Sequence, residues 1–268
     1  AAIYGSRAAN GVVIITTKSG KSGKLKVKFD TQLEATWYPR YDLMDATTYK
    51  MYDDRAYDEA ILAGVDKVYH RQNHYQGNTD WQDEMLRTGF IQNYNVALSG
   101  GTEALNFYTS FNYNNNNGAM KYTGFEKYGF RINTAGKKGI FSYGENLYYT
   151  YSNRKVLNGI GSVWQNFISM PPTISVYDPE HGSGFGYGDV DHANSYGLNP
   201  VAMQELENAK NKEEYLFGNV FGQVEYPEWA RAKLNFAYKT YTGETTTLRK
   251  TGSWTMGQGD DNANLNWN

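Results

Sequence analysis

Residues 25–37 read Leu-Lys-Val-Lys-Phe-Asp-Thr-Gln-Leu-Glu-Ala-Thr-Trp, a stretch in which apolar and polar side chains alternate. Leu25, Val27, Phe29 and Leu33 share one side of this alternation, and charged or amide side chains occupy the other. Because successive side chains of a β-strand point to opposite faces, the pattern predicts one long strand with an apolar and a polar face. Helical periodicity is weak nearly everywhere else, and we therefore expect an all-β fold.

Six further runs show the same alternation and predict antiparallel strands. They pair as hairpins through short turns near residues 99–104, 134–139 and 227–231. All six prolines fall outside the predicted strands, as expected because proline cannot donate a hydrogen bond to a strand ladder. The six runs are residues 92–99, 105–114, 127–133, 141–151, 216–226 and 232–241.

The connections between these strands alternate between long and short. Long loops are expected at about residues 39–91, 115–126, 152–214 and 242–268, with a short turn between each long loop and the next. Outer-membrane β-barrels show this asymmetry, because their periplasmic turns are short and their extracellular loops are long. A soluble or surface-attached all-β carbohydrate-binding module stays open as the alternative, because a face packed on a second sheet shows the same alternation.

Composition excludes several classes of protein. The chain of 268 residues has a mean hydropathy of −0.68 and no long apolar run, which excludes a helical membrane span but not a membrane-spanning strand. A net charge of −2 without a basic stripe argues against nucleic-acid binding. With no cysteine and no catalytic residue signature, we expect no cofactor, no metal site and no enzymatic activity. The 24 tyrosines suit bilayer interfaces and ligand stacking.

The first eighteen residues, Ala-Ala-Ile-Tyr-Gly-Ser-Arg-Ala-Ala-Asn-Gly-Val-Val-Ile-Ile-Thr-Thr-Lys, resemble the closing segment of the plug domain in TonB-dependent transporters of the SusC/RagA family. The motif positions are Tyr4, Gly5, Arg7, Asn10 and Gly11. Further family-like strings follow in order: Asp42-Leu-Met-Asp45, Thr79-Asp-Trp-Gln-Asp83, Arg87-Thr-Gly89, Asn95-Val-Ala-Leu-Ser-Gly-Gly101, Met170-Pro-Pro-Thr173, Asn199-Pro200 and Gly218-Asn219.

This resemblance implies a large transmembrane β-barrel, built in the family from twenty-two antiparallel strands around an N-terminal plug. Residues 1–20 would then end the plug domain, and residues 21–268 would form the first part of the barrel, with about seven strands. A seven-stranded wall would leave unpaired edges in the bilayer, where no water satisfies backbone groups. We therefore expect the chain to be an internal part of a longer polypeptide.

The resemblance also implies active import across the bacterial outer membrane. In similar proteins a SusD-like surface lipoprotein covers the mouth, the ligand is an oligosaccharide or sometimes a peptide, and TonB supplies the energy through a segment outside this sequence. Whether two transporter–lid pairs form a dimer is left open. Loop side chains that can contact a ligand or the lid are Trp81, Trp164, Tyr177, Tyr187, Asp189, Asp191 and Tyr196, although they can equally serve to order the loops.

Glu145 does not fit the predicted apolar face, where it lies between Tyr143 and Leu147. A carboxylate is costly in the middle of a bilayer, so we expect Glu145 to lie near a membrane interface, close to the turn at Gly136, or to be covered by a neighbouring protein. The barrel interpretation also predicts aromatic residues at strand ends.

Overall fold

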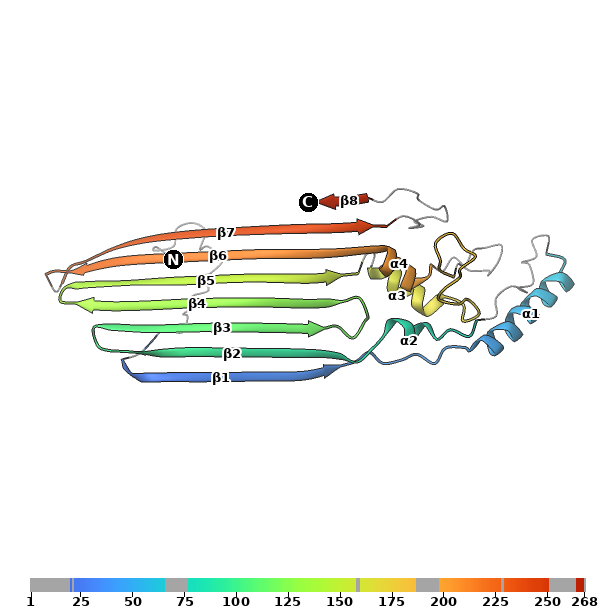
Figure 1. Ribbon diagram of the computed structural model, residues 1–268, viewed down its shortest axis with the longest axis horizontal. Helices are drawn as coiled ribbons and strands as arrows, with labels where there is room; N and C mark the ends of the chain where they lie inside the picture. The colour runs from blue at the N-terminus through green and yellow to red at the C-terminus, as the bar shows by residue number, and fades with distance from the viewer. Residues whose placement is uncertain are drawn as a thin grey trace.

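The structure is a computed structural model that describes residue 20 and residues 22–65, 77–157, 160–186, 198–227, 229–250 and 264–267. Its frame is one antiparallel sheet whose strands lie side by side in chain order (Figure 1). Each of the seven predicted runs falls on one of the first seven strands, which confirms the all-β prediction. The strands are β1 Gly23–Thr36, β2 Gly89–Gly101, β3 Leu105–Asn117, β4 Gly124–Lys138, β5 Phe141–Val156, β6 Glu207–Glu225, β7 Arg231–Arg249 and β8 Asn264–Trp267.

Short turns lie at one end of the sheet and long connections at the other. Residues 102–104 and 139–140 form two of the turns and residues 226–227 and 229–230 belong to the third, on the left of Figure 1, and the helices lie on the right. Gly139 has a φ of +60°, a conformation that glycine adopts without strain because it lacks Cβ. The predicted asymmetry is therefore present in the described part of the chain.

The long connections contain four helices that the sequence analysis did not predict: α1 Ala46–Leu62, α2 Trp81–Met85, α3 Ile160–Ser169 and α4 Pro200–Leu206. None of these helices is long and apolar enough to cross a membrane. The expected loop at residues 152–214 is wrong at both ends, because β5 continues to Val156 and β6 already begins at Glu207. The expected loop at 242–268 likewise contains the end of β7 and all of β8. The segments added to β5, β6 and β7 are mainly polar on both faces and so lack the alternation that reveals a strand, whereas β8, Asn-Leu-Asn-Trp, alternates over only four residues.

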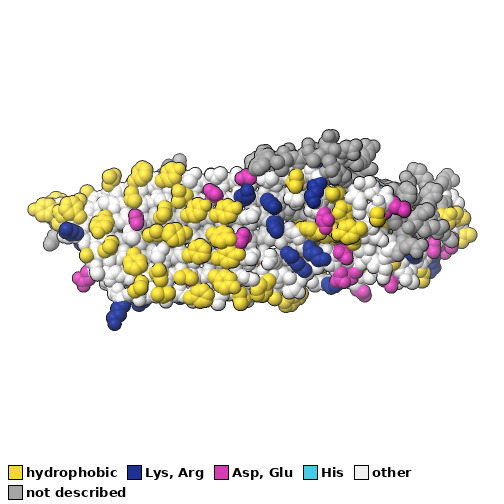
Figure 2. Space-filling view, viewed as in Figure 1, with side chains coloured by type: hydrophobic (Ala, Val, Ile, Leu, Met, Phe, Trp, Pro, Cys, Tyr) yellow, Lys and Arg dark blue, Asp and Glu magenta, His cyan; other side chains and the backbone are white. Residues whose placement is uncertain are grey.

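Strand register keeps the two faces of the sheet chemically distinct. Phe111 of β3 lies opposite Val96 of β2 on one side and Phe130 of β4 on the other. We call this side the apolar face; it also carries Val27, Leu147, Val220 and Phe236. The opposite, polar face is rich in asparagine: Asn93, Asn95, Asn112, Asn114, Asn133, Asn146, Asn219 and Asn235. Figure 2 shows the apolar face, where hydrophobic side chains cover much of the sheet.

The buried hydrophobic core lies at the loop end of the sheet. Helices α2, α3 and α4 pack there together with residues 77–80, 119–122 and 170–186, and we call this assembly the loop cluster. The sheet therefore acts as a wall, and the loop cluster is where chain segments distant in sequence come together. Its buried apolar residues are Trp81, Met85, Met120, Leu157, Val163, Phe167, Met170, Ile174, Phe185, Val201, Ala202 and Leu206.

Candidate functional site

The start of α2 and the residues just before it are hydrogen-bonded to the segment after α3. Trp81 is 3% exposed, and its indole Nε1 donates to the carbonyl oxygen of Pro171 at 3.0 Å. Thr79 donates twice, from its backbone nitrogen to Pro172 O at 2.8 Å and from its hydroxyl to Ile174 O at 2.7 Å. These bonds satisfy the carbonyl groups of Pro171, Pro172 and Ile174 and fix the relative position of two loops.

Asn199 joins α4 to the rest of the loop cluster. It is fully buried and caps α4, because its Oδ1 accepts from the backbone nitrogens of Val201 and Ala202, each at 3.1 Å. Its Nδ2 donates to Val176 O at 2.8 Å and to Gly186 O at 3.0 Å. One side chain thus satisfies two helix-terminal N–H groups and two loop carbonyls.

A cavity of about 620 Å³ opens between residues 40–49, the start of α2 and residues 168–172. Arg40 forms ion pairs with Asp80, at 2.6 Å, and with Asp83. The hydrogen bond to Asp83, followed by the charge of Asp80, raises the pKa of Arg40. Gln82 and the backbone of Tyr41 exchange two hydrogen bonds, of 2.8 and 2.9 Å. The cavity therefore has ordered polar walls with charged and amide groups, which suit recognition of a polar ligand.

A second network joins Tyr122, Tyr177 and Glu205. The hydroxyl of Tyr122 donates to Glu205 Oε1 at 3.0 Å, and that of Tyr177 approaches the same oxygen at 3.5 Å. Burial, and then the hydrogen bond to Glu205, raise the pKa of Tyr122. Burial and the charge of Glu205 raise the pKa of Tyr177. Both phenols therefore stay neutral at ordinary pH. Among the described residues, no group of three His, Asp or Glu side chains is arranged to hold a metal ion.

The predicted contact residues differ in how accessible they are. Trp81 is buried in the core of the loop cluster. Trp164 is half-buried, with its ring 4.9 Å from that of Phe167 and 5.3 Å from that of Tyr38. Tyr177 is 59% exposed. Tyr187, Asp189, Asp191 and Tyr196 lie outside the described residues, as do Tyr4, Gly5, Arg7, Asn10 and Gly11.

The cavity residues Arg40, Asp80 and Asp83 were not predicted as a group from the sequence. The only signal was the family-like string at residues 79–83, which contains both aspartates. The cation–π contacts of the polar face were not predicted either. Arg131 lies 4.7 Å from the ring centre of Tyr148, and Lys233 lies 4.2 Å from that of Phe221. Their spacing across neighbouring strands becomes visible only once the register is known.

A row of tyrosines crosses the apolar face at one level. Tyr94, Tyr113, Tyr128 and Tyr151 are successive cross-strand partners, with ring centres 6.4, 5.0 and 6.4 Å apart. On the side of the short turns, large apolar residues remain exposed, including Leu234 at 81% and Phe236 at 68%. We call Tyr94, Tyr113, Tyr128 and Tyr151, on β2 to β5, the tyrosine row. On β3 to β5 it separates the apolar band from polar strand ends, whereas on β1 and β2 the exposed Leu33 and Phe90 lie beyond its level on the same face.

No protein-family model matches the chain. It is 28% identical over 243 residues to the TonB-dependent receptor SusC of Bacteroides thetaiotaomicron, covering 82% of this chain and 23% of SusC. It is 31% identical over 226 residues to the TonB-dependent receptor P26 of Formosa agariphila, covering 82% of this chain and 22% of P26. The chain thus spans less than a quarter of the length of these relatives. A solved structure of the RagAB peptide importer in the open-open state matches with a TM-score of 0.65 at 19% identity, over 93% of this chain and 31% of that chain.

Proposed function

The chain is a homologue of the TonB-dependent receptor SusC and its relatives, and from this premise we propose that it forms part of the wall and mouth of an outer-membrane importer. The observation that carries the proposal is the apolar face bounded by the tyrosine row. A membrane-spanning barrel requires an outward apolar band with aromatic residues at its borders.

The height of the apolar band fits a bilayer. On β5 the band runs from Phe141 at the turn to Tyr151 in the tyrosine row. Ten residue steps span about 34 Å along a strand. With the tilt of about 40° that barrel strands have, this becomes about 25 Å along the membrane normal, the height of the apolar band in such barrels. The loop cluster then lies on the extracellular side.

In the proposed importer, the chain catalyses no chemical reaction; it binds the ligand and lets the ligand pass through the barrel. Its relatives are named as receptors, and RagAB is named as a peptide importer. We propose that the ligand is an oligosaccharide or a peptide, that a SusD-like lipoprotein covers the mouth, and that TonB supplies the energy. The polar face, with its asparagines, would line the lumen, and residues 1–20 would end the plug that fills it.

The loop cluster is the proposed contact surface for the ligand or the lipoprotein. Tyr177 offers an exposed ring, Trp164 a partly exposed one, and the 620 Å³ cavity offers Arg40 with its two aspartates. The buried Trp81 would position these groups without touching the ligand. Tyr177→Ala should weaken binding without unfolding the cluster, and Tyr52→Ala on α1, where the side chain is 54% exposed, is the matched control. Equal effects of both variants would argue against a contact at Tyr177.

The function is tested by purifying the full-length protein from outer membranes in mild detergent and identifying what accompanies it. We expect a protein much larger than this chain that migrates as a heat-modifiable barrel and brings a SusD-like lipoprotein with it. Loss of uptake of the bound nutrient on deletion of TonB would support energised import. A soluble protein without partners would overturn the proposal and favour the carbohydrate-binding module.

A further inference from the structure

On β3 to β6 the sheet continues beyond the level of the tyrosine row, and there the apolar face becomes polar and carries lysines. Four residues past Tyr151 on β5 lies Lys155, and its direct cross-strand partner on β6 is Lys210. Like charges placed opposite each other destabilise a strand pair. Neither lysine forms an ion pair with a carboxylate among the described residues. Figure 2 shows Lys and Arg side chains gathered between the apolar band and the loop cluster.

A hollow of about 520 Å³ adjoins Lys155 at the ends of β3, β4 and β5. Two further cations line it. Arg87 donates to the carbonyl oxygens of Gly118 at 2.9 Å and Thr123 at 3.3 Å, and Lys121 donates to Asp83 O at 2.9 Å. These acceptors are neutral carbonyls, so they orient the two side chains without cancelling their charge. The amide side chains of Asn115, Asn117 and Asn153 also line the hollow.

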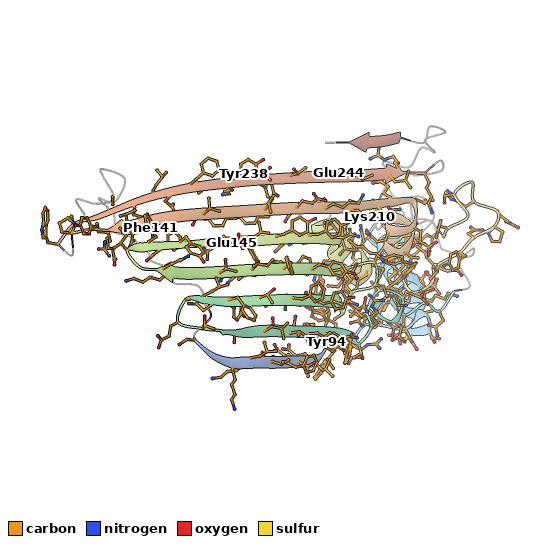
Figure 3. The ribbon with its side chains drawn as sticks, turned by 60° about the vertical axis from the view of Figure 1, so that its left-hand side comes forward. Tyr94, Phe141, Glu145, Lys210, Tyr238 and Glu244 are labelled. Atoms are coloured by element: carbon orange, nitrogen blue, oxygen red, sulfur yellow. The ribbon has the colours of Figure 1, made fainter. Side chains whose placement is uncertain are left out.

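Among the described residues that line the hollow, Glu126 is the single carboxylate beside the cations Arg87, Lys121 and Lys155, so the hollow is net positive. Glu126 lines the hollow, but its Oε1 accepts from the hydroxyls of Tyr113 and Tyr128, at 3.0 and 2.8 Å, and is held at the tyrosine row. Glu244 pairs with Lys212 at 3.6 Å. Glu214 lies opposite Tyr151, at the level of the row. Figure 3 labels Lys210 and Glu244 at the loop end of the sheet, far from Phe141 at the turn end.

Asn153, which lines the hollow, also carries a polar atom that lacks a partner among the described residues. The Oδ1 atom of Asn153 is buried and accepts no hydrogen bond in the described structure. Buried acceptors are normally satisfied, because leaving one unpaired is costly.

We propose that Arg87, Lys121, Lys155 and Lys210 bind the phosphate-bearing headgroup of an outer-leaflet lipid, whose acyl chains lie on the apolar band below. The proposal rests on the proposed function, because it requires the sheet to span the outer membrane. Lys155 is about 13 Å beyond Tyr151 along the strand and about 10 Å along a membrane normal, close to the headgroup region. Continuity with the apolar band favours a lipid over a free anion or a protein.

The experiment uses the full-length protein in detergent micelles with diphosphoryl lipid A as the probe. The double variant Lys155→Gln/Lys210→Gln removes two positive charges that repel each other, so it should fold. The matched control Lys24→Gln/Lys26→Gln removes two exposed lysines at the turn end of β1. Lipid bound per barrel is measured by native mass spectrometry across a lipid titration, and heat-modifiability reports the folded barrel in every variant.

We expect the double variant to bind lipid A about 25-fold more weakly, since each lysine near an anionic surface contributes a factor of about five. The control variant Lys24→Gln/Lys26→Gln should bind lipid A as the wild type does, which shows that the effect requires Lys155 and Lys210. Dephosphorylated lipid should bind the wild type more weakly than lipid A does, which shows that the effect requires the phosphates. Equal binding by wild type and the double variant would overturn the proposal, as would displacement of the lipid by millimolar inorganic phosphate. A folded barrel without lysine-dependent lipid binding would overturn only this inference. A protein that forms no barrel would overturn the proposed function.

Discussion

The indole nitrogen of Trp81 donates a 3.0 Å hydrogen bond to the carbonyl oxygen of Pro171, and so connects the loop after β1 with the loop after β5. The two residues lie 90 positions apart in the chain. Because the strand ladders do not include this contact, it can be weakened while the sheet stays intact. The order of the loop cluster therefore rests on a few such bonds and on its apolar core.

Trp81→Ala should destabilise the loop cluster by about 3 to 5 kcal/mol, because it leaves a cavity in the core and an unpaired carbonyl. Hydrogen exchange of α3 and α4 in the full-length protein would report the change, while the protection of β3 to β5 should be retained. Trp37→Ala, at a side chain that is 72% exposed, is the control. Equal loss of protection in the sheet would show that the cluster and the wall unfold together.

Asn199→Ala should cost about 2 to 4 kcal/mol, since it removes a helix cap and leaves two loop carbonyls without donors. Asn199→Asp keeps the capping oxygen but loses the donors to Val176 and Gly186, and it places a charge in a buried site. The cost of Asn199→Asp should therefore be at least as large. Protease sensitivity of residues 173–186 measures both variants. An unchanged cleavage rate for Asn199→Ala would contradict this role.

Glu145→Leu should raise the free energy of unfolding of the barrel by about 1 kcal/mol, because it removes an exposed carboxylate from the apolar band. Glu145 lies four of the ten residue steps from Phe141 at the turn end to Tyr151 (Figure 3), so in the proposed barrel it lies near the middle of the apolar band and not at the expected interface. Glu126→Leu on the same face should be destabilising, because the hydroxyls of Tyr113 and Tyr128 lose their acceptor. Urea unfolding in lipid bilayers compares the two, and a loss of stability in Glu145→Leu would count against the membrane assignment.

The stability of the loop cluster should fall as pH rises above about 10, the usual pKa of an unfolded tyrosine. The folded state binds the proton of Tyr122 more tightly than the unfolded state, because burial and Glu205 raise its pKa. Its stabilising effect is therefore complete below pH 10 and declines toward the folded pKa. Tyr122→Phe should flatten this alkaline decline relative to the wild type, as followed by hydrogen exchange between pH 8 and 11. Parallel pH profiles would show that other groups dominate.

Alternation predicted the strands where one face is apolar and did not predict them elsewhere. In β6, residues 207–214 read Glu-Asn-Ala-Lys-Asn-Lys-Glu-Glu, and nothing in this run distinguishes a strand from a loop. It lies beyond the level of the tyrosine row, where both faces are polar, so only pairing with β5 and β7 reveals it. The short strand β8 falls outside the prediction for a different reason, because its sequence Asn-Leu-Asn-Trp alternates over only four residues.

The loop cluster was only partly predictable. Residues Val163, Trp164, Phe167 and Ile168 recur at the spacing of a helix, so α3 had a readable signal that the β pattern around it obscured. Asn199-Pro200 is likewise a cap followed by a first-turn proline, a recognisable helix start. The cavity had no such signal, because Arg40 meets Asp80 and Asp83 only through tertiary contacts.

The length of β6 and β7 sets how far the mouth stands from the bilayer. Both strands have 19 residues, and β6 continues for seven residues from Glu214, at the level of the tyrosine row, to Glu207 beside α4. Seven steps correspond to about 24 Å of strand and about 18 Å of height at the usual tilt. The rim is therefore a hydrogen-bonded extension of the wall, stiffer than a loop of equal length. Removing two facing residues from each strand would preserve the alternation of faces and lower this side of the rim by about 5 Å, so rim height can evolve or be engineered separately from loop sequence.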